Sequence, residues 1–168
     1  DPANDPLSTV ATSVHCMEDC LPGFCPIRVP LALELDGEAI PGHVWQGEYT
    51  FQLPLARSLL AFNAYSEGWA LYAEQLADEL GVYDDAPVER LGYLQSIAFR
   101  ACRLVVDTGL HAKRWTRDEA IRWFAATNGS SVAEVTSEVD RYCVWPGQAC
   151  GYKVGHSEIN RLRAHAQQ

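Results

Sequence analysis

Three side chains of this protein, Glu38, His43 and Glu67, are of the types that carry out metal-assisted hydrolysis. A catalytic zinc ion is typically held by three protein ligands, and it lowers the pKa of a bound water molecule toward about 7. His43 and Glu67 are candidate ligands, and Glu38 is a candidate general base. In zinc hydrolases a histidine directly precedes this base, but here that position holds Gly37. The sequence therefore predicts a zinc site that lacks one ligand.

The segment 37–43 contains a proline that changes how its two ends are related. Two zinc ligands on a regular helix usually lie four residues apart, whereas positions 37 and 43 are separated by about 240° around a helix. Pro41 removes one backbone hydrogen bond and collides with the carbonyl of the preceding turn. A kink at this point would bring both ends of the segment to one metal. The alternative is a helix end at Pro41 and Gly42 with an incidental His43.

Glu67 lies among aromatic residues, with Tyr65, Trp69 and Tyr72 at helical spacing around it. Such a stripe usually packs into a core, where a glutamate needs a cation, a metal or water as its partner. Glu74 shares a helical face with Glu67. The two carboxylates are either a metal ligand with a supporting group or part of a solvated stripe.

Four polar residues of a later segment, Arg100, Arg103, Asp107 and His111, fall within an arc of about 80° on a helix. Residues at this spacing ordinarily form surface ion pairs. The segment is also apolar over much of its circumference, which favours a central helix. In that case Asp107 is expected to fix the tautomer of His111, and His111 to donate a hydrogen bond to an oxyanion.

The last polar cluster lies on both sides of the helix break Pro146-Gly147 and contains Arg141, Gln148 and Tyr152. A tyrosine hydroxyl can donate a hydrogen bond to a transition state, and arginine is the usual partner of a substrate carboxylate. The alternative is a kinked helix pair with buried, hydrogen-bonded tyrosines.

These residues must be positioned by helices, because apolar residues recur at three- and four-residue spacing over the last two thirds of the chain. Thr116 with Glu119 and Ser131 with Glu134 have the pattern of capping boxes that begin two helices. Gly81 is placed to end an earlier helix. We predict an all-α domain of about five helices: 58–80, 88–111, one beginning at each capping box, and 148–166.

With 168 residues, of which 48% are hydrophobic and 21% charged, the chain is able to form one globular core. Its net charge of -9 argues against nucleic acid and anionic membranes as partners. Residues 1–35 are predicted to be irregular, and residues 36–168 to form the helical domain. The first segment contains Cys16, Cys20 and Cys25, which are free or disulfide-bonded thiols or, with His15, a second zinc site. Localisation, whether cytoplasmic, periplasmic or secreted, does not follow from the composition.

In the order in which they occur, these motifs resemble those of the domain of unknown function 885 family, bacterial proteins that are regarded as zinc peptidases of the gluzincin type. The matching segments are Glu38–Gln46, Glu67–Glu74, Arg100–His111 and Glu138–Gly155. The resemblance implies a mainly helical metallohydrolase that binds zinc and acts on peptides. It implies His43 and Glu67 as zinc ligands and Glu38 as the base. The further implied catalytic and substrate contacts are His111, Tyr152, Arg103, Arg141 and Gln148.

The chain departs from this family pattern in two ways. Gly37 supplies no metal ligand, and members of the family are several times longer, with a large helical region before these motifs. A missing N-terminal region or a second copy of the chain is therefore an expected protein partner. Two functions compete: a zinc-dependent peptidase impaired by Gly37, and a catalytically inactive domain that keeps the cleft as a peptide-binding or scaffold site.

Overall fold

The computed structural model of the protein describes residues 37–38, 41–60, 62–85 and 87–168. These ranges contain seven helices and no strand, so the all-α prediction is confirmed. The helices are α3 (His43–Thr50), α4 (Leu55–Leu59), α5 (Asn63–Glu79), α6 (Pro87–Lys113), α7 (Arg117–Asn128), α8 (Val132–Val144) and α9 (Gln148–Ala166). The predictions for the segment 1–35, including those for Cys16, Cys20 and Cys25, lie outside the described residues.

The five predicted helices correspond to α5 through α9, and the count of five missed α3 and α4. The helix predicted over 58–80 is interrupted, because α4 ends at Leu59 and α5 begins at Asn63. The apolar spacing continues across this break, and periodicity alone therefore gave no sign of the interruption.

The helix ends form where local side chains satisfy the free backbone groups. Thr116 and Glu119 form a complete capping box at the start of α7, and Ser131 accepts a hydrogen bond of 3.2 Å from the backbone of Glu134 at the start of α8. Gly81, with φ of 80°, ends α5 in the left-handed conformation that glycine adopts without strain. The two predicted helix starts and the helix end at Gly81 are confirmed, although at Ser131 only one of the two hydrogen bonds of a capping box is formed.

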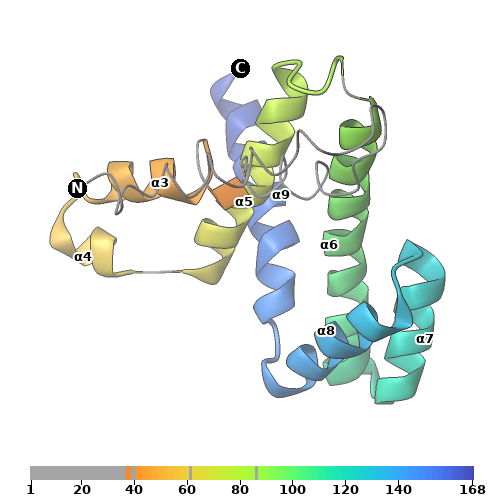
Figure 1. The fold of residues 1–168 in the computed structure, drawn as a ribbon. Helices are drawn as coiled ribbons and strands as arrows, with labels where there is room; N and C mark the ends of the chain where they lie inside the picture. Colours follow the sequence, from red (N-terminus) through yellow and green to blue (C-terminus); the bar gives the residue numbers. More distant parts are fainter. Residues whose placement is uncertain (1–36, 39–40, 61, 86) are drawn as a thin grey trace, which may run out of the picture.

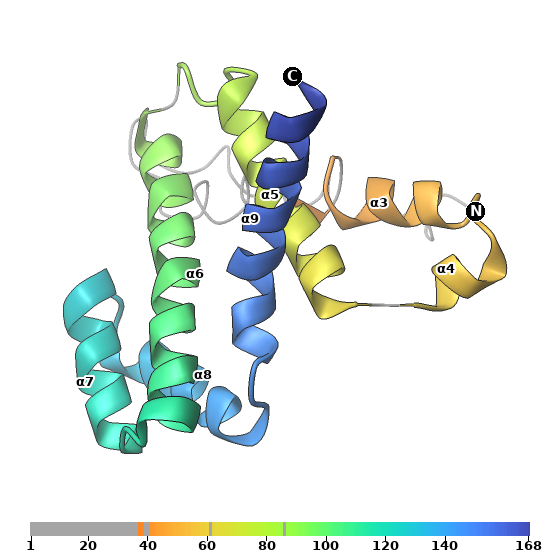
Figure 2. The same ribbon diagram turned by 180° about the vertical axis from the view of Figure 1, so that it is seen from behind.

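Helices α5 and α9 form the most extensive helix pair, and α6 runs alongside them (Figures 1 and 2). Helices α7 and α8 pack at the C-terminal end of α6. The main core lies among α6, α7 and α8, where Val106, Phe124, Val135, Val139 and Tyr142 are almost completely buried. This core fixes the end of α6 against α8, and it thereby positions the polar residues that both helices carry.

Glycines allow α5 and α9 to approach backbone to backbone. A Cβ atom added to Gly68 would lie 2.5 Å from the Cα atom of Gly155, and one added to Gly155 would overlap the carbonyl oxygen of Ala64. Real Cβ atoms essentially never come so close, so these positions need glycine. The neighbouring residues Glu67 and Tyr152 are brought together by this close crossing.

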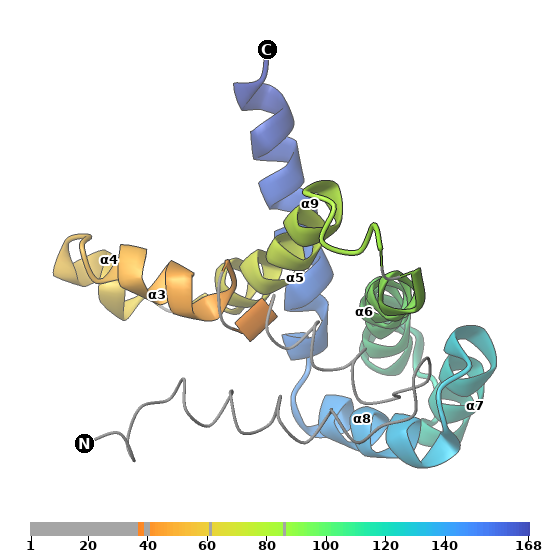
Figure 3. The same cartoon turned by 45° about the horizontal axis from the view of Figure 1, so that its top comes forward.

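Helices α3 and α4 project away from the other helices in all three ribbon views (Figure 3). Helix α3 is joined to α5 by the stacked rings of Trp45 and Trp69, whose centroids are 5.4 Å apart, and by a 2.8 Å hydrogen bond from the Trp69 indole to the carbonyl of Pro41. Tyr72 of the aromatic stripe is buried, but Tyr65 is largely exposed. The prediction that this stripe packs in the core therefore holds for only part of it.

The thiols of α6, α8 and α9 are free. Cys102 is buried and Cys150 is partly buried, but Cys143 is exposed. Cys102 therefore acts as a small buried apolar residue, whereas Cys143 does not. Within the described ranges, no helix has the length and hydropathy needed to cross a membrane.

Candidate ligand-binding pocket

A pocket of about 420 Å³ lies between α5, α6, the start of α8, α9 and the residue pair 37–38. Its lining residues are Gly37, Glu38, Glu67, Ala70, Leu71, Glu74, Ser96, Arg100, Glu134 and Tyr152. Four of these are glutamates and one is an arginine, so the pocket is rich in carboxylates but contains one guanidinium group. Among the residues predicted from sequence to be catalytic, Glu38 and Tyr152 both line it.

His43, Glu67 and Tyr152 meet at one side of this pocket. The Nε2 atom of His43 lies 3.7 Å from a carboxylate oxygen of Glu67. The polar contact with the Glu67 carboxylate raises the pKa of His43 above its usual 6.5. The contact with His43, and after it the proximity of the Tyr152 hydroxyl, lowers the pKa of Glu67 below its usual 4.5. Each side chain of the pair thus stabilises the charged form of the other.

The side chains of the described residues do not complete a zinc site. Two zinc ligands at about 2.1 Å in tetrahedral geometry have donor atoms about 3.4 Å apart, and the 3.7 Å between His43 and Glu67 is close to this value. The position expected to supply the third ligand is Gly37, which has no side chain. No group of three histidine, cysteine, aspartate or glutamate side chains in the described ranges is arranged to hold a metal ion. The predicted zinc centre is therefore not formed there.

Glu74 lies deep in the pocket, below the residues that form the pocket rim. It is buried, and it accepts a hydrogen bond of 3.1 Å from the hydroxyl of Ser96. A Cβ atom added to Gly37 would lie 3.5 Å from the other carboxylate oxygen of Glu74. Glu38, the predicted base, is exposed at the rim. Position 37 thus faces the interior of the pocket, whereas the side chain of position 38 is open to solvent.

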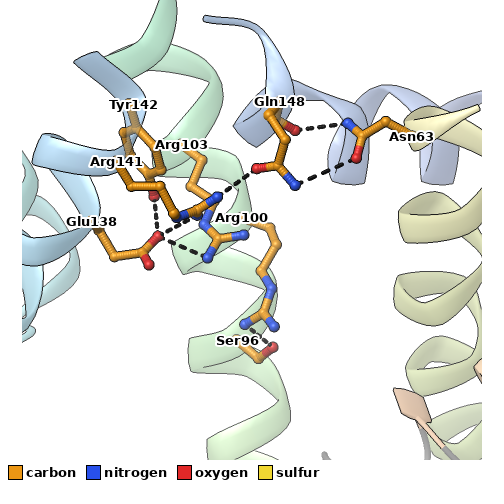
Figure 4. Close-up of polar contacts among 8 residues, drawn as sticks. All are labelled: Asn63, Ser96, Arg100, Arg103, Glu138, Arg141, Tyr142 and Gln148. Atoms are coloured by element: carbon orange, nitrogen blue, oxygen red, sulfur yellow. Dashed lines mark hydrogen bonds and ion pairs between the residues drawn. The ribbon is translucent and has the colours of Figure 1, made fainter. Parts of the chain in front are cut away.

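The predicted substrate contacts Arg103, Arg141 and Gln148 lie together in a second polar network, which Figure 4 shows. One carboxylate oxygen of Glu138 accepts hydrogen bonds from Arg103 at 2.8 Å, from Arg141 at 2.8 Å and from the Tyr142 hydroxyl at 2.6 Å. Arg141 also donates to the side-chain oxygen of Gln148 at 2.5 Å. Burial alone would raise the pKa of Glu138, but the hydrogen bonds from Arg141 and Tyr142 lower it overall. These three predicted residues bind partners within the protein, and none of them lines the pocket.

His111 lies away from the pocket, and its predicted pairing with Asp107 does not form. Asp107 instead accepts the backbone N–H of Gly147 with both carboxylate oxygens, at 3.0 and 3.1 Å. The Nε2 atom of His111 lies 3.0 Å from the carbonyl oxygen of Tyr142. Asp107 therefore caps the start of α9, where a carboxylate is favourable, and it does not orient His111.

Sequence reasoning did not assign Ser96 or Glu134 to the site, and it treated Arg100 only as a member of a polar arc. Ser96 and Arg100 are four residues apart on α6, and this spacing places them on one helical face toward α5. Glu134 was recognised as part of a capping motif. Its place at the pocket depends on how α8 packs, which the local sequence does not reveal.

The fold and pocket together define an all-helical domain with a glutamate-rich ligand pocket. A family profile described as "Bacterial protein of unknown function (DUF885)" matches residues 37–168. The chain therefore belongs to this family, and the resemblance seen in its motifs is confirmed at that level.

Two solved structures are similar to the chain. One is of a proposed lipoprotein from Colwellia psychrerythraea, with 48% identity and a TM-score of 0.79 over 83% of this chain and 24% of that one. The other is of a proposed lipoprotein of unknown function from Shewanella oneidensis, with 28% identity and a TM-score of 0.77 over 88% of this chain and 29% of that one. The chain thus spans less than a third of the length of each relative. No curated protein matches it.

Proposed function

We propose that this domain binds peptides in the pocket between α5, α6 and α9 without zinc-dependent hydrolysis. The proposal rests on the side chains at the three positions where zinc ligands were expected. His43 and Glu67 pair with each other at 3.7 Å, and the third position is Gly37. The two remaining side chains thus contact each other, and the pocket stays open for an organic ligand.

The size and lining of the pocket support a peptide ligand. A volume of about 420 Å³ is within the range of small-molecule sites. Ala70 and Leu71 provide apolar contact area, while Tyr152 and Ser96 provide hydroxyl groups. A short peptide carries both apolar side chains and backbone hydrogen-bonding groups, so it matches such a mixed lining.

A zinc-dependent peptidase is the second candidate, because one observation favours it. The separation of His43 and Glu67 is close to that of two ligands on one zinc ion, and Glu38 lines the adjoining pocket. Such an enzyme requires a third ligand that the described residues do not supply. We therefore place it behind the peptide-binding function.

Affinity selection from a tripeptide library tests the proposal. Purified protein is incubated with the library in a metal chelator, and retained peptides are identified by mass spectrometry. We expect a subset of tripeptides to be retained, and Tyr152→Phe to reduce their retention because it removes a pocket hydroxyl. The matched control is Tyr49→Phe on α3, where the ring is exposed and outside the pocket. Retention of no peptide by the wild-type protein would refute the proposed function.

A further inference from the structure

One arginine of the described chain differs from all the others in its electrostatic surroundings. Of the ten described arginines, six form ion pairs with aspartate or glutamate: Arg90, Arg103, Arg117, Arg141, Arg161 and Arg163. Of the four that have no such pair among the described residues, Arg57, Arg114 and Arg122 are exposed to solvent. Arg100 is the remaining one, and it is partly buried in the wall of the pocket.

The guanidinium group of Arg100 has more donors than its described partners use. Its Nη1 atom donates a 2.7 Å hydrogen bond to Ser96, whose hydroxyl donates to Glu74. Its Nε atom is buried and has no hydrogen-bond partner among the residues that the structure describes. A guanidinium group carries five N–H donors, and it binds planar carboxylates particularly well. A buried donor without a partner is costly, and a bound ligand is one explanation for it.

Two of the carboxylates that line the pocket with Arg100 already interact with other groups. Glu67 interacts with His43 and Tyr152, and Glu74 accepts from Ser96. Arg103 and Arg100 both lie over the Tyr152 ring, with guanidinium carbons 4.7 and 5.9 Å from its centroid. Arg103 is ion-paired with Glu138, whereas no described carboxylate forms an ion pair with Arg100.

We propose that Arg100 binds the terminal carboxylate of a peptide, so that the ligands of this pocket are peptides with a free C-terminus. This inference rests on the proposed peptide-binding function. The glutamates that line the rest of the pocket repel a carboxylate, and they thereby direct it to Arg100. A peptide whose carboxylate is replaced by an amide cannot neutralise Arg100, and it has only one oxygen, so it cannot form the two parallel N–H···O bonds that a carboxylate forms.

The test compares one tripeptide library in two forms, with free and with amidated C-termini, in affinity selection by the wild-type protein. We expect the free acids to bind about tenfold more tightly or better than the matching amides, as is usual when a charged hydrogen bond is lost. Arg100→Gln should remove this preference. The matched control Arg122→Gln changes an exposed arginine of α7 that forms no ion pair within the described part of the chain, and it should leave the preference intact.

The outcomes separate the two proposals. Equal binding of acids and amides by the wild-type protein would overturn the role of Arg100 and leave the peptide-binding function standing. Failure of both library forms to bind would overturn both. The comparison of acid and amide uses the wild-type protein alone, so it remains decisive even if Arg100→Gln does not fold. A thermal unfolding midpoint for each variant identifies that case.

Discussion

Restoring the missing ligand should convert the pocket into a zinc site. Gly37→His adds an imidazole at the position that would precede the base in a zinc hydrolase. A Cβ atom at this position has its nearest contact at 3.5 Å, with Glu74, which is an ordinary packing distance. The backbone there is not in the left-handed region that only glycine favours. A histidine can therefore be accommodated, and Glu74 is placed to accept a hydrogen bond from its ring.

The expected gain in zinc affinity can be estimated from sites with known ligand numbers. Zinc fingers bind zinc with about 10–16 kcal/mol through four ligands, so that each ligand contributes on average about 3 kcal/mol. That value corresponds to about a 100-fold increase in affinity. Zinc binding requires His43 to be neutral, because only an unprotonated imidazole nitrogen is a ligand. Since the pKa of His43 is raised, the gain should be largest above pH 7.

Competition with a chromophoric chelator at pH 8 measures this gain. Gly37→Ala is the matched control, because it introduces the same Cβ atom without an imidazole. Glu38→Gln, combined with Gly37→His, should leave zinc affinity unchanged, because Glu38 is exposed at the rim and is not counted among the ligands. Equal zinc affinities for Gly37→His and Gly37→Ala would refute the assignment of position 37, His43 and Glu67 to one metal site.

Three further predictions concern the elements that hold the pocket. Gly155→Ala should destabilise the fold by about 3 kcal/mol in chemical denaturation, because its Cβ atom would overlap α5; Gly47→Ala, which meets no atom within 4 Å, should not destabilise it. An NMR titration should give His43 a pKa above 6.5 that falls in Glu67→Gln. The stability gained from protonated His43 is thus fully present below pH 6.5, and it is lost as pH rises through the raised pKa of His43. An unshifted His43 pKa in the NMR titration would contradict the pairing with Glu67. Burial lowers the pKa of His156 to about 4, so stability should fall by up to about 3 kcal/mol between pH 6.5 and pH 4, and His156→Gln should reduce this loss.

Short-range signals predicted much of the helical framework. Capping at Thr116 and Ser131 and the left-handed Gly81 depend on residues within one turn, so the sequence contains all of the necessary information. The break between α4 and α5 was missed because the apolar period continues through it. Sequence periodicity indicates which face of a helix is apolar, but it does not indicate whether the helix is interrupted.

Only some of the pocket residues and their partners could be predicted, because many contacts depend on how separate helices pack. Glu67 and Tyr152 were recognised from their motifs, and the glycines beside them bring the two helices into contact. The partners of Arg103 and Asp107 depend instead on how α6 packs against α8 and the start of α9. Sequence spacing suggested partners on the same helix, whereas the observed partners, Glu138 and Gly147, come from other parts of the chain.

The central claim is that the pocket binds peptides without using zinc to hydrolyse them. One incubation of the tripeptide library with the protein, with and without a metal chelator, tests this directly, because mass spectrometry detects both retained peptides and cleavage products. Our account predicts that the same peptides are retained under both conditions and that none is cleaved. Retention that requires zinc, or cleavage that the chelator abolishes, would contradict it.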